Sequence, residues 1–256
     1  MDLPAGKAGN KTSKPAFAAG RYFKYAIGEI ILVVLGILIA LQINNWNENR
    51  IASIDELQML KTLKIGLEAD LSDLKWNEKR IELSIVSANK VIHSIERNLP
   101  YRDSISDHIG IMMFPVMFVN STSAFETLKS KGINLISNDD LRNQIIDVYD
   151  SEYSFFLKNE KVVVSEVIEN AHRQLFSTRF EEAYVFDLND KSNYKPRLTP
   201  LNFETLKTDQ EFIYFIKSFK NRLNLLLEFH YRSRLLKYVD ALIQAIDNEI
   251  KHLKND

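Results

Sequence analysis

One stretch of 18 residues, AIGEIILVVLGILIALQI at 26–43, constrains this chain more than any other feature. A helix of that length rises about 27 Å, which is close to the hydrocarbon thickness of a bilayer. The stretch is apolar except for Glu29 near its start and Gln42 near its end, where both side chains can reach an interface. It therefore predicts a transmembrane helix over residues 25–46.

Aromatic residues flank the stretch on both sides. Tyr22 and Tyr25 precede it and Trp46 follows it, and such rings prefer the headgroup level of a membrane. A secretory signal peptide is the alternative interpretation. The 24-residue polar leader is long for a signal peptide and no Ala-x-Ala cleavage site follows the apolar stretch, so an uncleaved anchor is favoured.

Basic residues are distributed unequally about the predicted span. Five precede the apolar stretch 26–43, whereas only Arg50 and Lys61 lie in the 20 residues after that stretch; the five are Lys7, Lys11, Lys14, Arg21 and Lys24. Because basic residues favour the cytoplasmic side, the N-terminus is predicted to be cytoplasmic. Residues 1–24 are then a disordered basic cytoplasmic tail, and residues 47–256 lie in the periplasm, outside the inner membrane.

Three segments resemble a known family. Residues 20–50, GRYFKYAIGEIILVVLGILIALQINNWNENR, are similar to the membrane signature GEIxLVVxGILIAxxINNWNE of an uncharacterised family of bacterial single-pass envelope proteins, and residues 122–132 and 135–142 are similar to later parts of it. The resemblance implies an N-terminal anchor followed by a helical exported domain. It brings no catalytic residue, substrate or cofactor, because the family is a domain of unknown function.

Two features of the span concern partners of the helix. Glu29 lies about one turn from Tyr25, so it either reaches the interface or is protonated, or else it binds a second helix. Gly36 and Ala40 have the small-residue spacing that lets two membrane helices approach closely. A homo-oligomer through the transmembrane helix is therefore one prediction.

The positions of glycine and proline predict an all-α protein. No glycine occurs after Gly132, and the long stretches 16–99, 116–195 and 201–256 contain no proline. Apolar residues recur at helical spacing within them. The fold expected after the anchor is an elongated antiparallel bundle with long helices at about 47–98, 139–180 and 208–253, together with a short one.

The first long helix carries a seam with the period of a coiled coil. Steps of three and four residues from Leu57 to Leu99 meet 13 positions, of which only Lys64 and Glu78 are not apolar. Such a seam packs either inside its own bundle or against a second copy in a parallel homodimeric stalk. The two long helices that follow favour the bundle.

Residues 100–138 are predicted to be irregular apart from one short helix near 123–131, with a capping box at Ser123 and Glu126. Ahead of that helix lies the apolar segment 109–119, whose proline and glycine argue against a helix. This segment is either buried in the core or exposed as a partner surface. The residues of the possible partner surface are Met112, Met113, Phe114, Met117 and Phe118.

Two capping signals mark the later helices. Asn138 and Asp139 suit the start of the second long helix, and Thr208 with Glu211 forms a capping box at the start of the third. Between the two long helices lies a polar break at residues 187–200.

The composition and the spacing of potential ligands argue against several classes of site. The chain has no cysteine and a net charge of −1, which argues against zinc-ribbon, iron–sulfur and strongly basic nucleic-acid-binding proteins. Two Glu-x-x-His pairs have the spacing of a di-iron bundle, at Glu169–His172 and Glu249–His252, but both point away from the apolar stripes of their helices. We therefore predict no catalytic, cofactor or metal site.

Together these observations predict a non-enzymatic bitopic inner-membrane protein. Its contacts are the lipid bilayer and an envelope protein partner, or a second copy through the transmembrane or long helix, with no role for nucleic acid. The alternative is a periplasmic sensory or small-ligand-binding bundle that signals through a membrane partner.

Overall fold

The computed structural model describes residues 17–114, 117–186 and 194–255. The chain divides into two compact units, Met1–Ile54 and Asp55–Asp256. Helix α1 (Phe17–Glu96) contributes to both. Of the predicted cytoplasmic tail, residues 1–16 lie outside the described part, and the rest belongs to α1.

In the first unit, α1 contains the apolar stretch. Every side chain described there, from Phe23 onward, is exposed. Within the described residues, one helix is long and apolar enough to cross a membrane, judged by its length and its best mean hydropathy of 2.6. This helix is compatible with a protein that crosses a membrane once.

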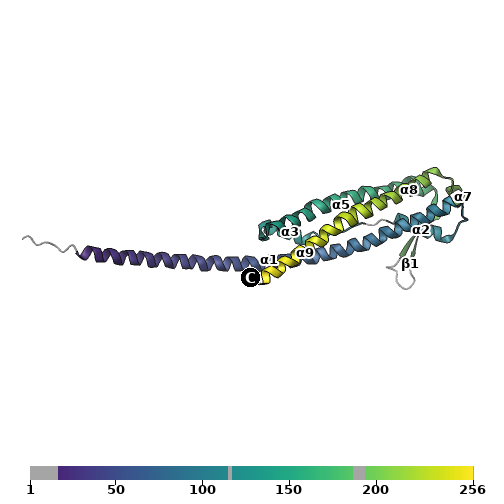
Figure 1. The fold of residues 1–256 in the computed structure, drawn as a ribbon. Coiled ribbons are helices and arrows are strands. Elements are labelled where there is room, and N and C mark those ends of the chain that lie inside the picture. Colours follow the sequence, from purple (N-terminus) through teal and green to yellow (C-terminus); the bar gives the residue numbers. More distant parts are fainter. Residues whose placement is uncertain (1–16, 115–116, 187–193, 256) are drawn as a thin grey trace, which may run out of the picture. The chain divides into compact units, whose positions relative to one another are not determined.

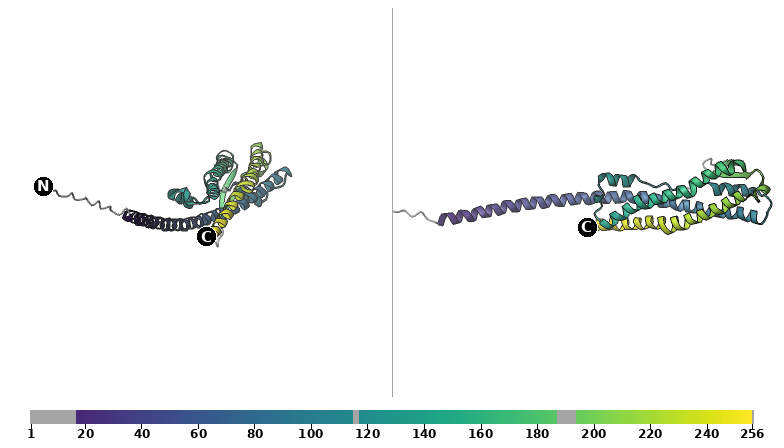
Figure 2. Two further views of the ribbon diagram at one scale, coloured as in Figure 1. Left: turned by 60° about the vertical axis from the view of Figure 1, so that its left-hand side comes forward. Right: turned by 90° about the horizontal axis from the view of Figure 1, so that it is seen from above.

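The second unit contains three helical columns that lie side by side (Figures 1 and 2). The first column is α1 from Asp55 onward. The second is the continuous run α4 (Asp139–Ile146), η2 (Asp147–Glu152), α5 (Tyr153–Glu160), η3 (Lys161–Ser165) and α6 (Glu166–Gln174), in which η2 and η3 are π-helical. The third is α8 (Gln210–Leu225), π-helical η5 (Leu226–Leu235) and α9 (Leu236–Asn255). The predicted all-α class is confirmed.

Shorter elements join the columns. They are α2 (Asp103–Met113), α3 (Ser123–Lys131), η1 (Ile133–Leu135), η4 (Phe176–Thr178), strands β1 (Phe180–Phe186) and β2 (Tyr194–Pro200), and α7 (Phe203–Leu206). The second column ends at Gln174, earlier than the predicted residue 180, because the chain turns there toward β1.

The seam of the first column packs inside the second unit. Leu60, Leu67, Leu74 and Ile81 are almost completely buried within this one chain. Their burial corresponds to the intramolecular alternative. The same seam is therefore unavailable for a parallel homodimeric stalk.

The first and third columns run antiparallel. Lys64 Nζ lies 2.6 Å from Asp247 Oδ1, and further along α1 Glu78 Oε1 lies 2.6 Å from Arg232 Nε. Residue numbers thus rise along one column and fall along the other. These ion pairs connect the partly exposed edges of the two columns.

The first and second columns run parallel, unlike neighbours in a simple up-and-down bundle. Glu56 Oε1 accepts a hydrogen bond from the backbone N–H of Ser137 (2.8 Å), and Asp70 Oδ2 accepts one from Tyr153 Oη (2.7 Å). Numbers rise together in both pairs. The reason is that residues 97–138 carry the chain back along the bundle before the second column starts.

The returning chain passes through an extended segment at residues 117–121. Its backbone N–H groups donate to carboxylates of the columns: Phe118 to Glu160 (2.8 Å), Val119 to Asp73 (3.2 Å) and Ser121 to Asp70 (2.7 Å). An extended segment inside a helical bundle has no ladder partner, and an unpaired buried N–H is costly. The carboxylates supply the missing acceptors.

Helix α2 occupies a region predicted to be irregular. Glycine in a helix costs only about 1 kcal/mol relative to alanine. Ile105, Ile109 and Met112 recur at helical spacing and are buried, so packing outweighs the cost of Gly110. Residues 109–113 are therefore helical, and the irregular structure predicted for them was wrong.

A β-hairpin follows the second column in the region interpreted as a polar break. Its strands pair antiparallel, from Phe180 opposite Pro200 to Phe186 opposite Tyr194, and its residues 187–193 lie outside the described part. Strand β2 packs on α2 at Gly110. A Cβ atom on that residue would lie 2.1 Å from the carbonyl oxygen of Pro196, so the close approach requires glycine.

The residues that cap the helix N-termini are partly different from those predicted by the sequence. Asn138 is the N-cap of α4 and accepts a hydrogen bond from Leu141 N–H (3.1 Å). The N-cap of α8 is Asp209 rather than Thr208, because the carboxylate of Asp209 accepts from two first-turn N–H groups. Helix α3 begins after Thr122 and no side chain caps it, so the box predicted at Ser123 was wrong.

Candidate functional site

The predicted anchor residues lie on α1. Tyr25, Glu29, Gly36 and Trp46 are exposed in the first unit, and so is Ala40, which shares a helix face with Gly36. A Cβ atom at Gly36 would meet no other atom within 4 Å. Tyr22 also belongs to α1, but its side chain lies outside the described part.

The predicted partner surface at 109–119 divides into core and surface residues. Met112, Met113 and Phe118 are at most 3% exposed and belong to the hydrophobic core. At these three positions the structure has the buried alternative. Met117 is exposed and Phe114 is partly exposed.

Phe114 belongs to a band of aromatic rings on the second unit. The guanidinium carbon of Arg80 lies 5.0 Å from the centre of the Phe114 ring and 5.5 Å from that of Trp76. On its other side, the Phe114 ring lies 5.9 Å from Tyr194. Helices α1 and α2 and the hairpin thus contribute to one continuous arrangement.

The band continues along the hairpin. Tyr194 contacts Tyr184 and Phe186 of β1 at ring-centre distances of 5.7 Å each. We call this set the aromatic surface; it consists of Trp76, Arg80, Phe114, Tyr184, Phe186 and Tyr194. Trp76, Tyr184, Phe186 and Tyr194 are each at least 41% exposed. Large exposed rings next to arginine are the residue types that dominate binding energy in protein interfaces.

Strand β1 adds a backbone feature to the aromatic surface. From Glu181 to Phe186 all its residues are exposed, and the strand contains no proline. Strand β2, in contrast, contains Pro196 and Pro200 and packs on α2. The outer edge of β1 can therefore receive a further strand from a partner, as exposed sheet edges do.

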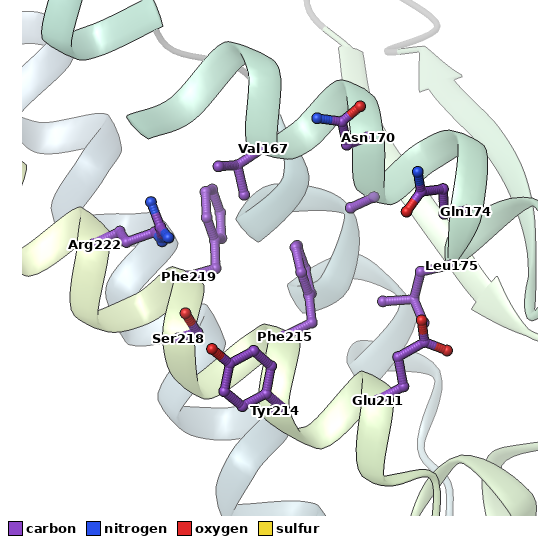
Figure 3. A pocket seen from close by; sticks show the side chains of 11 residues that line it. Val167, Asn170, Gln174, Leu175, Glu211, Tyr214, Phe215, Ser218, Phe219 and Arg222 are labelled. Atoms are coloured by element: carbon purple, nitrogen blue, oxygen red, sulfur yellow. The ribbon is translucent and has the colours of Figure 1, made fainter. Parts of the chain in front are cut away.

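A pocket lies between α6 and α8 (Figure 3). It has a volume of about 310 Å³, and the buried side chains of Ala171, Leu175 and Phe219 belong to its lining. Polar side chains also line it, including Asn170, Gln174, Ser218 and Arg222. Such a lining can hold a small ligand, but it presents no pair of nucleophile and base.

Glu211 is the one carboxylate among the residues of this pocket. Its Oε2 lies 2.6 Å from Nη2 of Arg179, and the same arginine binds Asp209 at 2.6 Å through Nε. The hydrogen bond that Arg179 donates to Asp209 and the charges of the nearby carboxylates raise the pKa of Arg179. Glu211 is thus already paired with a cation, and this ion pair connects the start of α8 to the chain that follows the second column.

The residues of the first Glu-x-x-His pair make other contacts. Glu169 pairs with Arg173 on the surface, and the ring of His172 lies 5.7 Å from that of Phe176. Within the described residues, no group of three or more His, Cys, Asp or Glu side chains could hold a metal ion.

Asp70 is a buried carboxylate, only 1% exposed. Burial raises its pKa, while hydrogen bonds from Tyr153 and from the backbone of Ser121 act in the opposite direction. Both carboxylate oxygens are engaged, Oδ1 by Ser121 and Oδ2 by Tyr153. Asp70 therefore holds the returning segment in place and is closed to a ligand.

Most of the aromatic surface was missed by the sequence analysis. Trp76 lies off the seam, which was a signal of its exposure. The hairpin contains Tyr184, Phe186 and Tyr194. Its first strand shows no alternation of apolar and polar residues, because both of its faces are exposed, so the sequence carried no signal of a strand there. Only the docking of β2 on α2 brings these rings to Phe114.

Comparison with known proteins identifies a family but no function. A model described as "Family of unknown function (DUF6090)" matches residues 29–199. The matched region includes most of the apolar stretch, all of α2 and the described parts of the hairpin up to Thr199, whereas α8 and α9 lie beyond it. No curated protein and no solved structure matches the chain.

Proposed function

Since the chain belongs to DUF6090, a family of unknown function, its role has to be inferred from its own residues, and we propose that it is a non-enzymatic bitopic membrane protein with an interaction domain. The observation that carries this proposal is the apolar stretch of α1, which is exposed throughout its described length. An apolar surface of this extent is unfavourable in water and is covered in a bilayer.

The compartment follows from charge. Five basic residues precede the stretch and two follow it closely, so the positive-inside rule places the N-terminus in the cytoplasm. For a bacterial inner membrane, this orientation puts the second unit in the periplasm. The resemblance at residues 20–50 supports the same arrangement.

The second unit is proposed to bind an envelope protein through the aromatic surface. Trp76 and Tyr194 supply large contact area at low entropic cost, and Arg80 adds a charge between two rings. The outer edge of β1 supplies backbone donors and acceptors for an added strand. The seam of α1 is used inside the bundle, so a homo-oligomer would form through Gly36 and Ala40 instead.

Protease accessibility tests the anchor and its orientation. A tag at the C-terminus of the full chain should be digested by trypsin added to intact spheroplasts, and the protein should stay in the membrane pellet after carbonate washing. A protected tag would contradict the orientation, and full-length protein in the soluble fraction would contradict the anchor.

Photo-cross-linking in cells tests the aromatic surface. Benzoylphenylalanine at Phe186 or Trp76 should capture a protein partner, whereas the same probe at Tyr238 should not. Tyr238 is a matched control because it is an aromatic residue of similar exposure, 46%, on α9. Equal adduct patterns at the three positions would contradict a partner at this surface.

A sensory or small-ligand-binding bundle is the second candidate. The pocket between α6 and α8 supports it, because it joins two columns whose packing a ligand could change. Native mass spectrometry of the purified full chain would detect such a ligand, and Phe215→Ala should reduce the bound fraction. Phe215 lines the pocket and is partly exposed.

A further inference from the structure

A second pocket lies where the chain turns from α1 into α2. Its volume is about 570 Å³, within the range of small-molecule sites. Its lining comes from the last turns of α1, from the connection around Pro100 and from the first turns of α2. Asn98 has a left-handed φ of 48° at this turn, which brings the connection back against the helix end.

The charged groups of this pocket all have the same sign. Lys90 and Arg102 line it, and neither forms an ion pair with any described residue. His93 and His108 add two imidazoles, and no aspartate or glutamate belongs to the lining. In a chain with a net charge of −1, this is a local concentration of positive charge.

The carboxylates nearest in sequence are Glu96, Asp103 and Asp107, and each is ion-paired with a residue outside the pocket. Asp103 lies 2.6 Å from Nη2 of Arg197, and Glu96 lies 2.6 Å from Nζ of Lys217. The hydrogen bond and the charge of Arg197 lower the pKa of Asp103. The two cations of the pocket therefore lack an anionic partner from the described part of the fold.

The start of α2 adds main-chain donors. This helix of 11 residues has Arg102 as its N-cap, and no side chain caps its first turn. Ser104 and Ile105 of that turn line the pocket; the N–H of Ile105 donates to the carbonyl oxygen of Arg102 (2.8 Å), which leaves the N–H of Ser104 for a ligand. Free N–H groups at a helix N-terminus favour an oxyanion, and an adjacent guanidinium can bind two of its oxygens.

Apolar side chains complete the lining and provide room beyond an oxyanion. Val86, Leu99 and Ile105 line the pocket together with Pro100. Two permanent cations match a doubly charged group better than a monocarboxylate. We infer that this pocket binds a phosphate monoester carried on a small apolar body. The inference is independent of the membrane anchor and of the aromatic surface.

Calorimetric titration of the full chain in an uncharged detergent and phosphate-free buffer tests this site. Phenyl phosphate should bind saturably with one molecule per chain, at least about tenfold more tightly than inorganic phosphate, and phenol should not bind. Lys90→Ala and Arg102→Ala should each weaken phenyl phosphate at least about tenfold. Lys237→Ala is a matched control, because Lys237 is exposed on α9 and lies outside this pocket, and it should leave the affinity within about twofold.

Circular dichroism of each variant will check that the fold is retained. Lys90→Glu is a further variant, and it should abolish binding. Absence of saturable phenyl phosphate binding to the folded chain would overturn the site, as would unchanged affinity in Lys90→Ala and Arg102→Ala. Competition by phosphatidylcholine vesicles that contain phosphatidic acid, but not by phosphatidylcholine vesicles alone, would assign the phosphate to a lipid headgroup. Failure of those vesicles to compete would assign it to a soluble ester.

Discussion

The carboxylate of Glu160 and the phenol of Tyr231 form a hydrogen bond in the core of the second unit. Tyr231 Oη donates to Glu160 Oε1 at 2.8 Å, which joins the second column to the third. The other oxygen of Glu160 accepts from the backbone of Phe118. Glu160 is only 3% exposed, so one buried acid connects both columns with the returning segment.

Glu160 should make the stability of the second unit depend on pH. Burial raises its pKa from 4.5 to about 7, against the effect of its two hydrogen bonds. Because the folded-state pKa is raised, its contribution is fully present below about pH 4.5 and is lost as pH rises through about 7. The loss is on the order of 3 kcal/mol, at about 1.4 kcal/mol per pKa unit. Urea unfolding of the full chain in detergent between about pH 5 and pH 8 measures it.

Glu160→Gln should flatten that pH dependence, because the amide cannot ionise. Its one carbonyl oxygen can still accept from Phe118 N–H, and the Tyr231 hydroxyl can accept from the amide NH2 group. Part of the slope remains, since burial also raises the pKa of Asp70. Glu166→Gln is the control, because Glu166 is exposed on the same column. An unchanged slope in Glu160→Gln would show that this carboxyl does not titrate in the expected range.

Tyr153→Phe should destabilise the second unit. The substitution removes the 2.7 Å hydrogen bond to Asp70, which retains only its bond from Ser121. A hydrogen bond to a buried charged group contributes about 1.5–3 kcal/mol. Thermal unfolding should show a melting temperature lowered by about 2–4 °C per kcal/mol.

Tyr149→Phe is the matched control for that substitution. The Tyr149 hydroxyl is buried without a hydrogen-bond partner in the described structure, so its removal should be neutral or stabilising. Equal destabilisation by the two variants would argue that the Asp70 bond is not the cause.

Gly110→Ala should displace the hairpin from α2. The new methyl group would lie 2.1 Å from Pro196 O and 2.8 Å from Arg197 N, and backbone atoms cannot yield without moving the strand. Overpacking costs about 1–3 kcal/mol, offset by about 1 kcal/mol from helix propensity. Chymotrypsin should cleave at Phe186 and Tyr194 faster than in the wild type, as followed by mass spectrometry.

Gly66→Ala is the control for Gly110→Ala, because its added methyl group would make a milder contact. Its methyl group would lie 3.1 Å from Ser121 Oγ, which belongs to a side chain that can rotate. We expect little change in stability and no change in cleavage of the hairpin. Unaltered cleavage in Gly110→Ala would contradict the close packing of β2 on α2.

Two arginines in the apolar stretch should impair membrane insertion. Each arginine near the centre of a transmembrane helix costs about 2.5–3.5 kcal/mol. In the double variant Leu35→Arg and Leu38→Arg, the carbonate-resistant fraction should fall, as measured by immunoblotting.

Ile51→Arg with Ile54→Arg is the control for those arginines. The side chains of Ile51 and Ile54 are 48% and 54% exposed, the same fractions as those of Leu35 and Leu38. Both isoleucines follow the predicted span. This control should remain in the membrane. If both double variants behaved alike, exposed apolar residues in general, rather than the stretch at 26–43, would determine localisation.

The sequence by itself determined the apolar stretch at 26–43 and the all-α class of the chain. Both are local properties, since helical periodicity and hydropathy are visible within a window of one or two dozen residues. The start of α4 is also determined locally, because the side chain of Asn138 accepts a hydrogen bond from Leu141, only three residues further along the chain.

Tertiary structure alone decided the direction of the columns, the burial of Met112 and the existence of the hairpin. Each depends on contacts distant in sequence. The returning segment is held by Asp70 and Glu160, which lie 51 and 42 residues from their backbone partners. Strand β2 needs the bare backbone of Gly110 on another element. The physical reason is that a carboxylate or a glycine has no periodic signal of its own, and its role appears only when packing removes it from water and places a partner beside it.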